Sequence, residues 1–228
     1  MASIVKPILD QASGAAGSTI WSRNGSGKYT RVRVGVTQPQ TTAAIQARAR
    51  FAALGLTWRT NITSDERMAW ADAASTAWVR NRLGREVRPM PWNLFVAVNY
   101  PRRIAGLAFL RLPPPDGHLT AFPIPGISSV TASRIFLTFD NTKPWAGAVG
   151  GFLNAYVSPH QPTTHRFHAT PYQFRGLILG AGTPPTSPKI IGTVGTVPPG
   201  RRVFVTCMVQ DNVGRRSVTW TIFADRPP

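Results

Sequence analysis

The stretches RVFVTCMV (residues 202–209) and SVTWTIF (residues 217–223) flank the turn DNVGRR (residues 211–216) and decide the fold of the C-terminal half. Both stretches are rich in β-branched and aromatic residues, which favour strands, and Asp, Asn and Gly are typical turn residues. The segment therefore predicts a β-hairpin. The single cysteine, Cys207, stands between Val205 and Val209, so we expect a thiol packed inside a strand.

Further strand-like runs precede this hairpin at residues 129–139, 151–157 and 174–179, with loops rich in proline and glycine between them. Five or more short strands at such spacing predict a β-sandwich. The closing hairpin is also similar to the last two strands of fibronectin type III and other immunoglobulin-like modules, which share its aromatic-rich strand and short turn. That resemblance implies an immunoglobulin-like sandwich over about the last hundred residues.

The N-terminal half begins with a predicted hairpin. Residues 18–23 and 28–34 alternate in character, and Asn24-Gly-Ser-Gly27 supplies the turn between them. A helix should follow Pro39, because apolar residues then recur in steps of three and four. Its apolar seam comprises Ala44, Ala47, Phe51, Leu54 and Trp58.

Two more helices are expected. Thr63-Ser-Asp-Glu66 has the pattern of a capping box, in which the threonine hydroxyl and the glutamate side chain each accept a backbone N–H. The helix that it starts should form an antiparallel pair with the first helix, because the connection is brief. A third helix is expected over residues 92–104, where Pro101 must kink or end it.

The triplet Pro113-Pro114-Pro115 divides the chain into two predicted domains, residues 1–112 and 113–228. Sixteen of the 21 prolines lie from Pro113 onward, whereas five of the seven tryptophans lie before it. A polyproline stretch is semi-rigid and would hold the two domains at a fixed spacing. The expected class is α+β, with a hairpin and antiparallel helices first and an immunoglobulin-like β-sandwich second.

Arginine dominates the charge of this chain. Of its 26 basic residues 22 are arginine, against nine acids, which gives a formal net charge of +17. Arginine is favoured over lysine where a planar guanidinium must grip a carboxylate, a phosphate or an aromatic face. We therefore expect an acidic partner, either protein or nucleic acid. The predicted partner-binding residues are Arg31, Arg33, Arg80, Arg82, Arg85 and Arg88.

The sequence offers no convincing catalytic set, cofactor site or metal site. Gly25-Ser-Gly-Lys28 looks like the end of a phosphate loop. That motif needs a glycine at position 22 and a serine or threonine at position 29, directly before a helix, but the chain has Ser22 and Tyr29 there. The loop histidines His160, His165 and His168 have no nearby acid or cysteine, and Arg166 would repel a cation. Asp140 and Asp211 are expected to stabilise turns and are not assigned to a catalytic site.

Residues 12–107 as a whole resemble a family of small phage and prophage proteins. The pattern begins with Gly14 and Gly17, continues through an arginine-bearing hairpin, and ends in helices that carry Arg and Trp. The matching positions are Gly14, Gly17, Arg23, Gly25, Gly27, Arg31, Arg33, Thr42, Gln46, Arg50, Phe51, Trp58, Thr63, Arg67, Trp70, Phe95 and Asn99. One departure is Val36-Thr-Gln-Pro39, where the family more often has Asn-Pro.

This resemblance implies a structural component of a bacteriophage virion, such as a head-decorating, capsid-stabilising, neck or tail protein. Its partners would be other virion proteins and further copies of the chain, with no membrane and no small-molecule substrate. The N-terminus lacks the apolar stretch of a signal peptide, so we expect synthesis in the host cytoplasm and assembly into the virion.

Two alternatives stay open. The first is a basic protein that contacts or is packaged with the genome, because arginines could neutralise phosphates. The second is an enzyme whose site lies in the β half without a recognisable motif. Activity would then depend on one of the few acids there, such as Asp116, Asp140 or Asp211.

Overall fold

A computed structural model describes residues 14–16, 19–24, 27–32, 40–80, 86–115, 123–167 and 172–228. Helices account for 29% and strands for 31% of the chain, and all strand pairs in the sheets are antiparallel, which confirms the predicted α+β class. The chain forms two compact units, residues 1–46 and 47–228. Each unit is described by itself below.

The first unit contains a small sheet of three strands in the order β1-β2-β3. These are β1 (Gly14–Ala16), β2 (Thr19–Asn24) and β3 (Gly27–Val32). Strands β2 and β3 pair with Asn24 opposite Gly27, so the predicted hairpin is confirmed. Strand β1 was not expected from the sequence.

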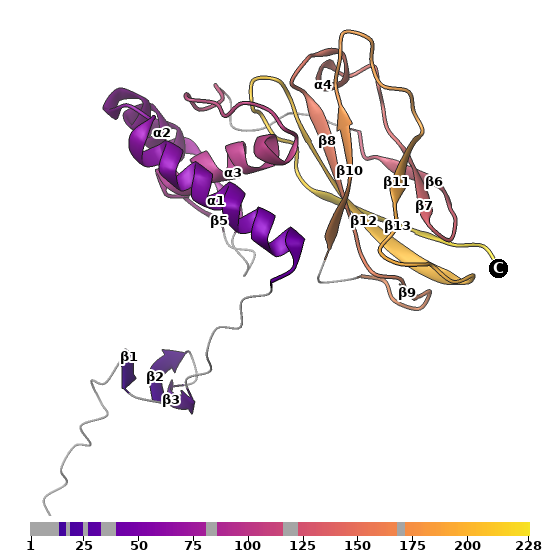
Figure 1. Ribbon diagram of the computed structural model, residues 1–228, viewed down its shortest axis with the longest axis horizontal. Coiled ribbons are helices and arrows are strands. Elements are labelled where there is room, and N and C mark those ends of the chain that lie inside the picture. The colour runs from indigo at the N-terminus through magenta and orange to yellow at the C-terminus, as the bar shows by residue number, and fades with distance from the viewer. Residues whose placement is uncertain are drawn as a thin grey trace, which may run out of the picture. The chain divides into compact units, whose positions relative to one another are not determined.

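Three helices follow, and their starts have local causes (Figure 1). Helix α1 (Thr42–Thr60) begins where the Thr41 hydroxyl accepts the N–H of Ala44 at 3.3 Å. Helix α2 (Ser64–Thr76) begins with the predicted capping box, since Thr63 Oγ1 accepts the Glu66 N–H and Glu66 Oε2 accepts the Thr63 N–H at 2.8 Å. Helix α3 (Pro91–Ile104) has proline in its first turn, where no N–H is needed.

The helices of the second unit share an aromatic core around Phe95 of α3. Its ring centroid lies 5.0 Å from that of Trp58 and 5.3 Å from that of Trp70, and both Phe95 and Trp70 are fully buried. Both α1 and α2 therefore pack on α3, and Arg67 of α2 also donates to the Trp58 and Arg59 carbonyls of α1. The predicted seam also changes, because Leu54 is buried whereas Phe51 remains 49% exposed.

Helix α3 continues past Pro101 to Ile104, so Pro101 does not end it. Proline has no N–H and cannot donate to the carbonyl of the residue four positions earlier, Ala97. That carbonyl instead accepts a hydrogen bond of 2.9 Å from Nη1 of Arg216. A distant arginine thus supplies the donor that the helix lacks.

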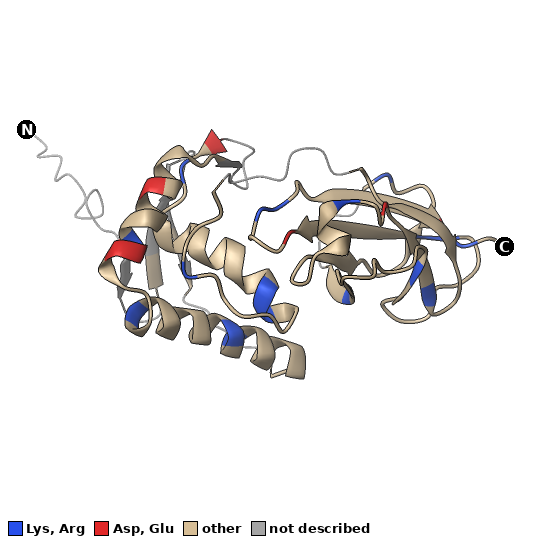
Figure 2. Ribbon diagram, turned by 90° about the horizontal axis from the view of Figure 1, so that it is seen from above, with Lys and Arg blue, Asp and Glu red and all other residues tan. Residues whose placement is uncertain are grey.

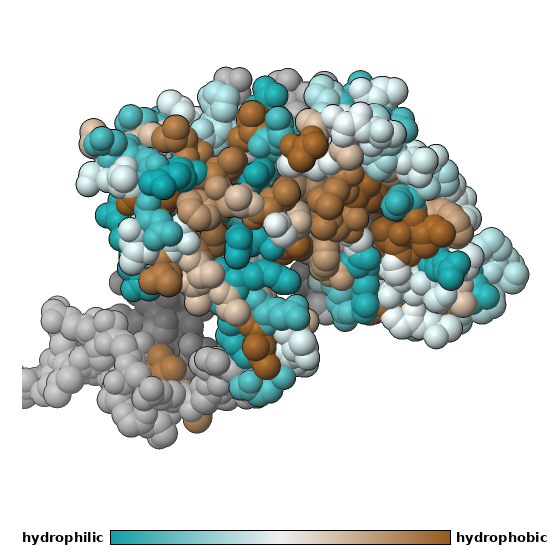
Figure 3. Space-filling view, turned by 45° about the horizontal axis from the view of Figure 1, so that its top comes forward, coloured by the Kyte–Doolittle hydropathy of each residue, from teal (hydrophilic) through white to brown (hydrophobic). Residues whose placement is uncertain are grey.

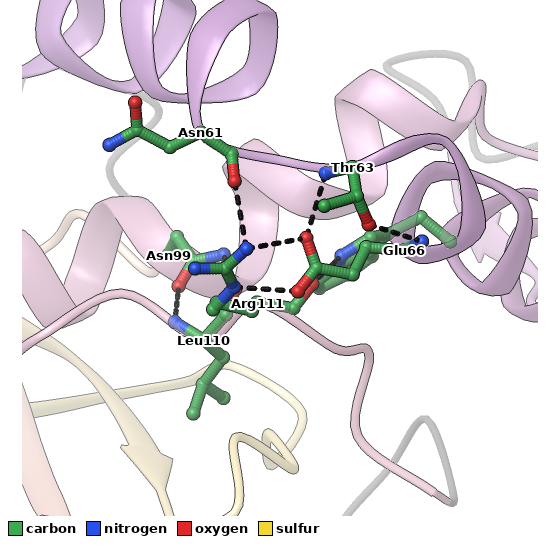
Figure 4. Close-up of polar contacts among 7 residues, drawn as sticks. Asn61, Thr63, Glu66, Asn99, Leu110 and Arg111 are labelled. Atoms are coloured by element: carbon green, nitrogen blue, oxygen red, sulfur yellow. Dashed lines mark hydrogen bonds and ion pairs between the residues drawn. The ribbon is translucent and has the colours of Figure 1, made fainter.

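The segment after α3 is fixed to the helices by polar contacts (Figure 4). Asn99 exchanges two hydrogen bonds with the backbone of Leu110, and the indole of Trp70 donates to the Arg111 carbonyl at 2.6 Å. The Arg111 guanidinium forms an ion pair of 2.6 Å with Glu66 and donates to the Asn61 carbonyl. The capping box of α2 therefore also anchors the chain that leads toward the strands.

The β part contains two antiparallel sheets (Figure 1). The larger sheet has the order β10-β8-β12-β13, with β9 beside β12, and the smaller has the order β11-β7-β6. Their bounds are β6 (Gly126–Val130), β7 (Arg134–Thr138), β8 (Phe152–Val157), β9 (Gln161–Pro162), β10 (Gln173–Leu179), β11 (Lys189–Gly192), β12 (Arg201–Gln210) and β13 (Trp220–Asp225). A short helix, α4 (Pro144–Gly147), precedes β8.

This arrangement confirms most of the predicted strands and corrects one. The run at residues 129–139 is two strands, because residues 131–133 form a turn in which the Thr131 hydroxyl accepts the Arg134 N–H. Strands β9 and β11 were not predicted. The closing hairpin is confirmed by the pairing of β12 with β13.

The two sheets share one apolar core. Alternate residues of β8 and β12, among them Leu153, Val205 and Cys207, point into it together with Ile135 and Ile191 from the smaller sheet. The Cys207 thiol is fully buried, as expected. The intervening residues of β8 and β12 lie on the opposite face of the larger sheet, where Phe152 and Met208 pack with Ala105.

Helices and sheets contact each other within the second unit. Gln210 Nε2 donates to the Val98 carbonyl of α3 at 3.1 Å, and Gly214 has a φ of +97° in the turn between β12 and β13. A side chain at Gly214 would also collide with Leu110. The predicted domain boundary at residues 112 and 113 falls inside this compact unit, and residues 116–122 lie outside the described part of the chain.

The low pKa of Glu66 predicts how the free energy of unfolding depends on pH. Hydrogen bonds from the Arg111 guanidinium and then from the Thr63 backbone lower the pKa of Glu66 from 4.5 to about 2. Because the folded-state pKa lies below the unfolded one, the stabilisation is present above about pH 4.5 and is lost as pH falls toward 2. The free energy of unfolding should therefore fall more steeply over this window in the wild type than in Glu66→Gln.

Asp72→Asn, on an exposed site of the same helix, is the matched control and should keep the wild-type slope. Chemical denaturation at successive pH values measures the free energy of unfolding of the wild type and of each variant. Parallel pH profiles for wild type and Glu66→Gln would contradict the prediction.

Candidate partner-binding surface

A short hairpin follows α2 and brings an exposed tryptophan and an arginine together. Strands β4 (Val79–Arg80) and β5 (Glu86–Val87) pair with Arg80 opposite Glu86. Their register places the flanking residues Trp78 and Arg88 side by side, and the guanidinium carbon of Arg88 lies 5.1 Å from the Trp78 ring centroid. Trp78 remains 51% exposed, so the pair forms an open cation–π contact at the base of the hairpin.

The six predicted arginines are only partly described. Arg31 lies in β3 and Arg80 in β4, whereas Arg33, Arg82 and Arg85 fall outside the described residues. Arg88 is exposed and is the one whose side-chain contact is established.

Several other arginines act inside the fold. Arg67 donates to the carbonyls of Trp58 and Arg59, and Arg102, which is buried, donates to the carbonyls of Ala108 and Asn212. Burial lowers the pKa of Arg102, and the nearby Asp211 partly offsets this. The sequence did not predict that these arginines donate to backbone carbonyls, because every residue has a carbonyl and no residue type identifies the acceptor.

Ion pairs use up most of the acids that the structure describes. The pairs are Glu66 with Arg111, Asp140 with Lys143, Asp211 with Arg215 and Asp225 with Arg202. Each pair removes one charge of each sign, so the net charge of +17 is unaffected. Lys and Arg are distributed over both the helical and the β part, with few acids between them (Figure 2). Exposed arginines include Arg59, Arg103, Arg134, Arg166, Arg175 and Arg201.

A groove of about 390 Å³ lies between α1 and α3. Ala47, Phe51 and Ala52 form its apolar wall, Tyr100 comes from α3, and Arg48 stands on the α1 side. The Phe51 and Trp92 rings pack in a T-shaped arrangement, with 5.9 Å between their centroids and 78° between their planes. The groove is therefore mostly apolar with a basic side.

The pKa of Tyr156 in β8 depends on residues of both α1 and α3. Burial raises the pKa of Tyr156, the nearby Tyr100 raises it further, and Arg216 and Arg50 oppose the rise. Tyr100 thus belongs both to the groove and to the surroundings of Tyr156. Burial lowers the pKa of Arg216, whereas the nearby Tyr156 raises it.

Asn154 is a fully buried amide on the same face of the larger sheet as Tyr156. Neither its Oδ1 nor its Nδ2 has a hydrogen-bond partner among the described residues. Its neighbour on β12 is Met208, whose sulfur accepts from Nε of Arg216 at 3.3 Å. An unsatisfied buried amide costs about 1–3 kcal/mol, so its retention here calls for a cause.

The residues considered for chemistry have structural roles where they are described. The Asp140 carboxylate accepts hydrogen bonds from the backbone N–H and the hydroxyl of Thr142. The Asp211 carboxylate accepts hydrogen bonds from the backbone N–H and the guanidinium of Arg215. Both acids therefore stabilise turns, as predicted. His160 and His165 are exposed loop residues, and no group of three potential metal ligands exists in the described part of the chain. His168 and Asp116 lie outside that part.

No protein-family profile, curated protein sequence or solved structure matches the chain. Within the described ranges, no helix is long and apolar enough to cross a membrane. The candidate surface is therefore defined by geometry and charge: the Trp78–Arg88 pair and the groove beside Tyr100.

The contact between Arg216 and Ala97 makes a prediction about stability. Arg216→Leu removes the donor to a partly buried helix carbonyl and should lower the free energy of unfolding by about 1–3 kcal/mol. In a Pro101→Ala background, residue 101 has an N–H for the same carbonyl, so the cost of Arg216→Leu should fall by about 1 kcal/mol. Guanidinium chloride unfolding of the double-mutant cycle measures this coupling.

Arg134→Leu, on an exposed site of β7, is the control and should show no coupling to Pro101→Ala. Additive effects of Arg216→Leu and Pro101→Ala would show that Arg216 does not compensate for the missing N–H.

Cys207 makes a prediction about reactivity. Burial raises the pKa of its thiol to about 12, and the thiolate is the reactive form. At pH 8 the native protein should not react with a colorimetric thiol reagent, whereas protein unfolded in guanidinium chloride should react fully. Rapid titration of the native thiol would place Cys207 outside the core.

Proposed function

We propose that this protein is a structural component of a bacteriophage particle that acts through contacts with other virion proteins and with further copies of itself. The observation that carries the proposal is the exposed Trp78 with Arg88 over its ring, at the base of a hairpin rich in arginine. Tryptophan and arginine are the residues most enriched at the energetic centres of protein interfaces.

The surface around it supports an assembly role. Hydrophobic side chains gather in a band across one face of the molecule (Figure 3), and contiguous apolar surface is typical of interaction sites. Large apolar side chains that are exposed include Met68, Met90, Val149, Phe167, Phe174, Leu179, Ile190, Val218 and Phe223. The N-terminal resemblance to phage and prophage proteins favours a head-decorating, capsid-stabilising, neck or tail component, made in the host cytoplasm and incorporated into the virion.

We further propose that the β part is an immunoglobulin-like module. In the constant type, such modules place their first, second, fourth and fifth strands in one sheet and their third, sixth and seventh in the other, and the variable type adds strands to the sheet of the third. Strands β6, β7 and β11 form one sheet here, and β8, β12 and β13 lie adjacent in the other, with β10 as a further strand beside β8. This order supports the proposal, and such modules commonly display or clamp partners on surfaces.

The second candidate function is binding of nucleic acid, and the net charge of +17 favours it. Phosphate contacts release counterions, so binding should then weaken steeply as salt rises. Size-exclusion chromatography with light scattering and absorbance at 260 and 280 nm separates the two functions. Discrete protein oligomers free of nucleic acid support assembly, whereas a nucleic-acid-rich species that dissociates in salt supports genome binding.

Incorporation into particles tests the first proposal. Replacing Arg80, Arg82, Arg85 and Arg88 together with serine should reduce the amount of protein in purified particles about tenfold or more, since loss of one charged interface contact costs about that factor. Quantitative mass spectrometry of particles measures the copy number, and circular dichroism checks that the fold is intact.

The matched control replaces Arg103, Arg134, Arg166 and Arg201 with serine, which removes the same charge from exposed sites elsewhere. It should incorporate like the wild type. Equal incorporation of the hairpin variant and the wild type would overturn the proposed role of the hairpin, and absence of the wild-type protein from particles would overturn the function.

A further inference from the structure

Strand β13 forms one edge of the larger sheet and differs from the other edge strands of the β part. The outer strands of the larger sheet are β10 and β13, and those of the smaller sheet are β6 and β11. We propose that β13 pairs antiparallel with β13 of a second copy of this chain, so that the larger sheet continues across both copies. The proposal rests on the proposed function, in which further copies of the chain are partners.

The other three edge strands carry features that oppose pairing with another chain. An edge strand presents unpaired backbone N–H and C=O groups, and proteins protect such edges with bulges, charges or short length. Strand β10 has a bulge after Phe174 and an exposed charge at Arg175, and β6 has a bulge after Ile127. Strand β11 is only four residues long and begins with Lys189.

Strand β13 has none of these protections. It is six residues long and pairs with β12 in an unbroken register, with no bulge. Residues 220–224 include no charge and no proline, and they are mostly β-branched or aromatic residues, which favour strands. Every second residue of an antiparallel strand directs its N–H and C=O away from its partner strand. Strand β13 can therefore accept a further strand on the side opposite β12.

Strand β6 lies near β13 but does not pair with it. It belongs to the smaller sheet, and Ile127 of β6 packs against the same core as Ile222 and Ala224 of β13. Those side chains point to the inner face of the larger sheet, so β6 lies across the sandwich from β13. Within the described ranges, no backbone hydrogen bond links residues 221–224 to a strand other than β12.

The sequence of β13 is complementary to itself in one antiparallel register. A two-fold axis through Ile222 places Ile222 opposite Ile222 and Thr221 opposite Phe223, and it keeps the inner and outer faces of both sheets aligned. A pair of a β-branched and an aromatic residue stabilises antiparallel strands. Thr221 and Phe223 are both exposed on the outer face, where the Phe223 ring lies 5.8 Å from that of Phe204. The ring is therefore held in place before a second copy binds.

Charge also favours a second copy at this edge. Copies with a net charge of +17 repel one another, so a shared interface needs a surface without unpaired cations. The one charged residue of β13, Asp225, forms a bidentate ion pair with Arg202 at 2.7 and 2.9 Å. In the proposed register Asp225 faces Thr219, so no like charges lie opposite each other. Nucleic acid fits this edge less well, because residues 220–224 offer no cation to a phosphate.

Size-exclusion chromatography with light scattering tests the proposal on the full chain, at concentrations up to about 100 µM. The wild type should form a dimer of twice the chain mass of 24.8 kDa. The double variant Thr221→Lys/Phe223→Lys places lysines opposite each other in the proposed register. Like charges directly opposite destabilise a strand pair, so the Kd of the dimer should rise about tenfold or more.

A charge-reversal variant tests the register itself. Thr221→Lys/Phe223→Glu changes the same two exposed positions but places a lysine opposite a glutamate, so its dimer should be about tenfold tighter than that of the double-lysine variant. Loss of the Phe223 ring affects both double variants equally. Near-ultraviolet circular dichroism confirms that each variant is folded.

The matched control is Ser129→Lys/Ile190→Lys, which adds the same two charges to exposed sites on the edge strands β6 and β11. It should dimerise like the wild type.

Weaker dimerisation of the double-lysine variant alone, with recovery in the charge-reversal variant, supports the proposal. A wild type that stays monomeric up to about 100 µM overturns it, as do equal Kd values for the double-lysine variant and the control. Equal Kd values for the two β13 variants, or association that disappears on nuclease treatment, also overturn it. Because particles are absent from this assay, its failure would leave the proposed function to be judged by incorporation.

Discussion

The contact between Arg216 and the carbonyl of Ala97 couples the helices to the larger sheet. Pro101 removes one N–H from α3, so the partly buried Ala97 carbonyl must find a donor elsewhere or raise the free energy of the fold. Arg216 supplies the donor from the segment that leads into β13. Three more contacts join the helical part to the end of β12 and the turn that follows it. Gln210 donates to the Val98 carbonyl, Arg102 donates to the Asn212 carbonyl, and Gly214 lies close to Leu110. The arrangement explains how a helix with an interior proline can still organise the packing of Trp58 and Trp70.

Arginine has two roles in this protein, and the surroundings of each guanidinium decide between them. Buried or half-buried arginines such as Arg102 and Arg216 donate to carbonyls, which a planar group with five N–H donors does well. Exposed arginines such as Arg88 remain available to a partner. Internal ion pairs cannot lower the excess of positive charge, so that excess favours association with acidic surfaces.

The buried amide of Asn154 lowers the stability of the fold, because it has no hydrogen-bond partner among the described residues. An apolar residue in place of Asn154 would satisfy the packing of the sheet at lower cost, since an unpartnered amide loses its hydration. Native proteins keep only a few such groups, and an ordered water or ion often satisfies them.

Local patterns in the sequence were sufficient for much of this fold. The hairpin at β2 and β3, the capping box of α2, the strand character of β8, β10, β12 and β13, and the buried thiol of Cys207 all follow from interactions between residues that are near in sequence. The helical seam was only partly right, because Leu54 is buried but Phe51 is not. The large positive charge and the turn roles of Asp140 and Asp211 were also readable from composition and spacing.

Tertiary structure decided what depends on groups distant in sequence. The sequence could not show that α2 packs on α3 or that Arg216 replaces the N–H missing at Pro101. The physical reason is that periodicity and capping act over a few residues, whereas a backbone carbonyl, a counter-charge or a cavity wall is recruited from wherever the folded chain brings it.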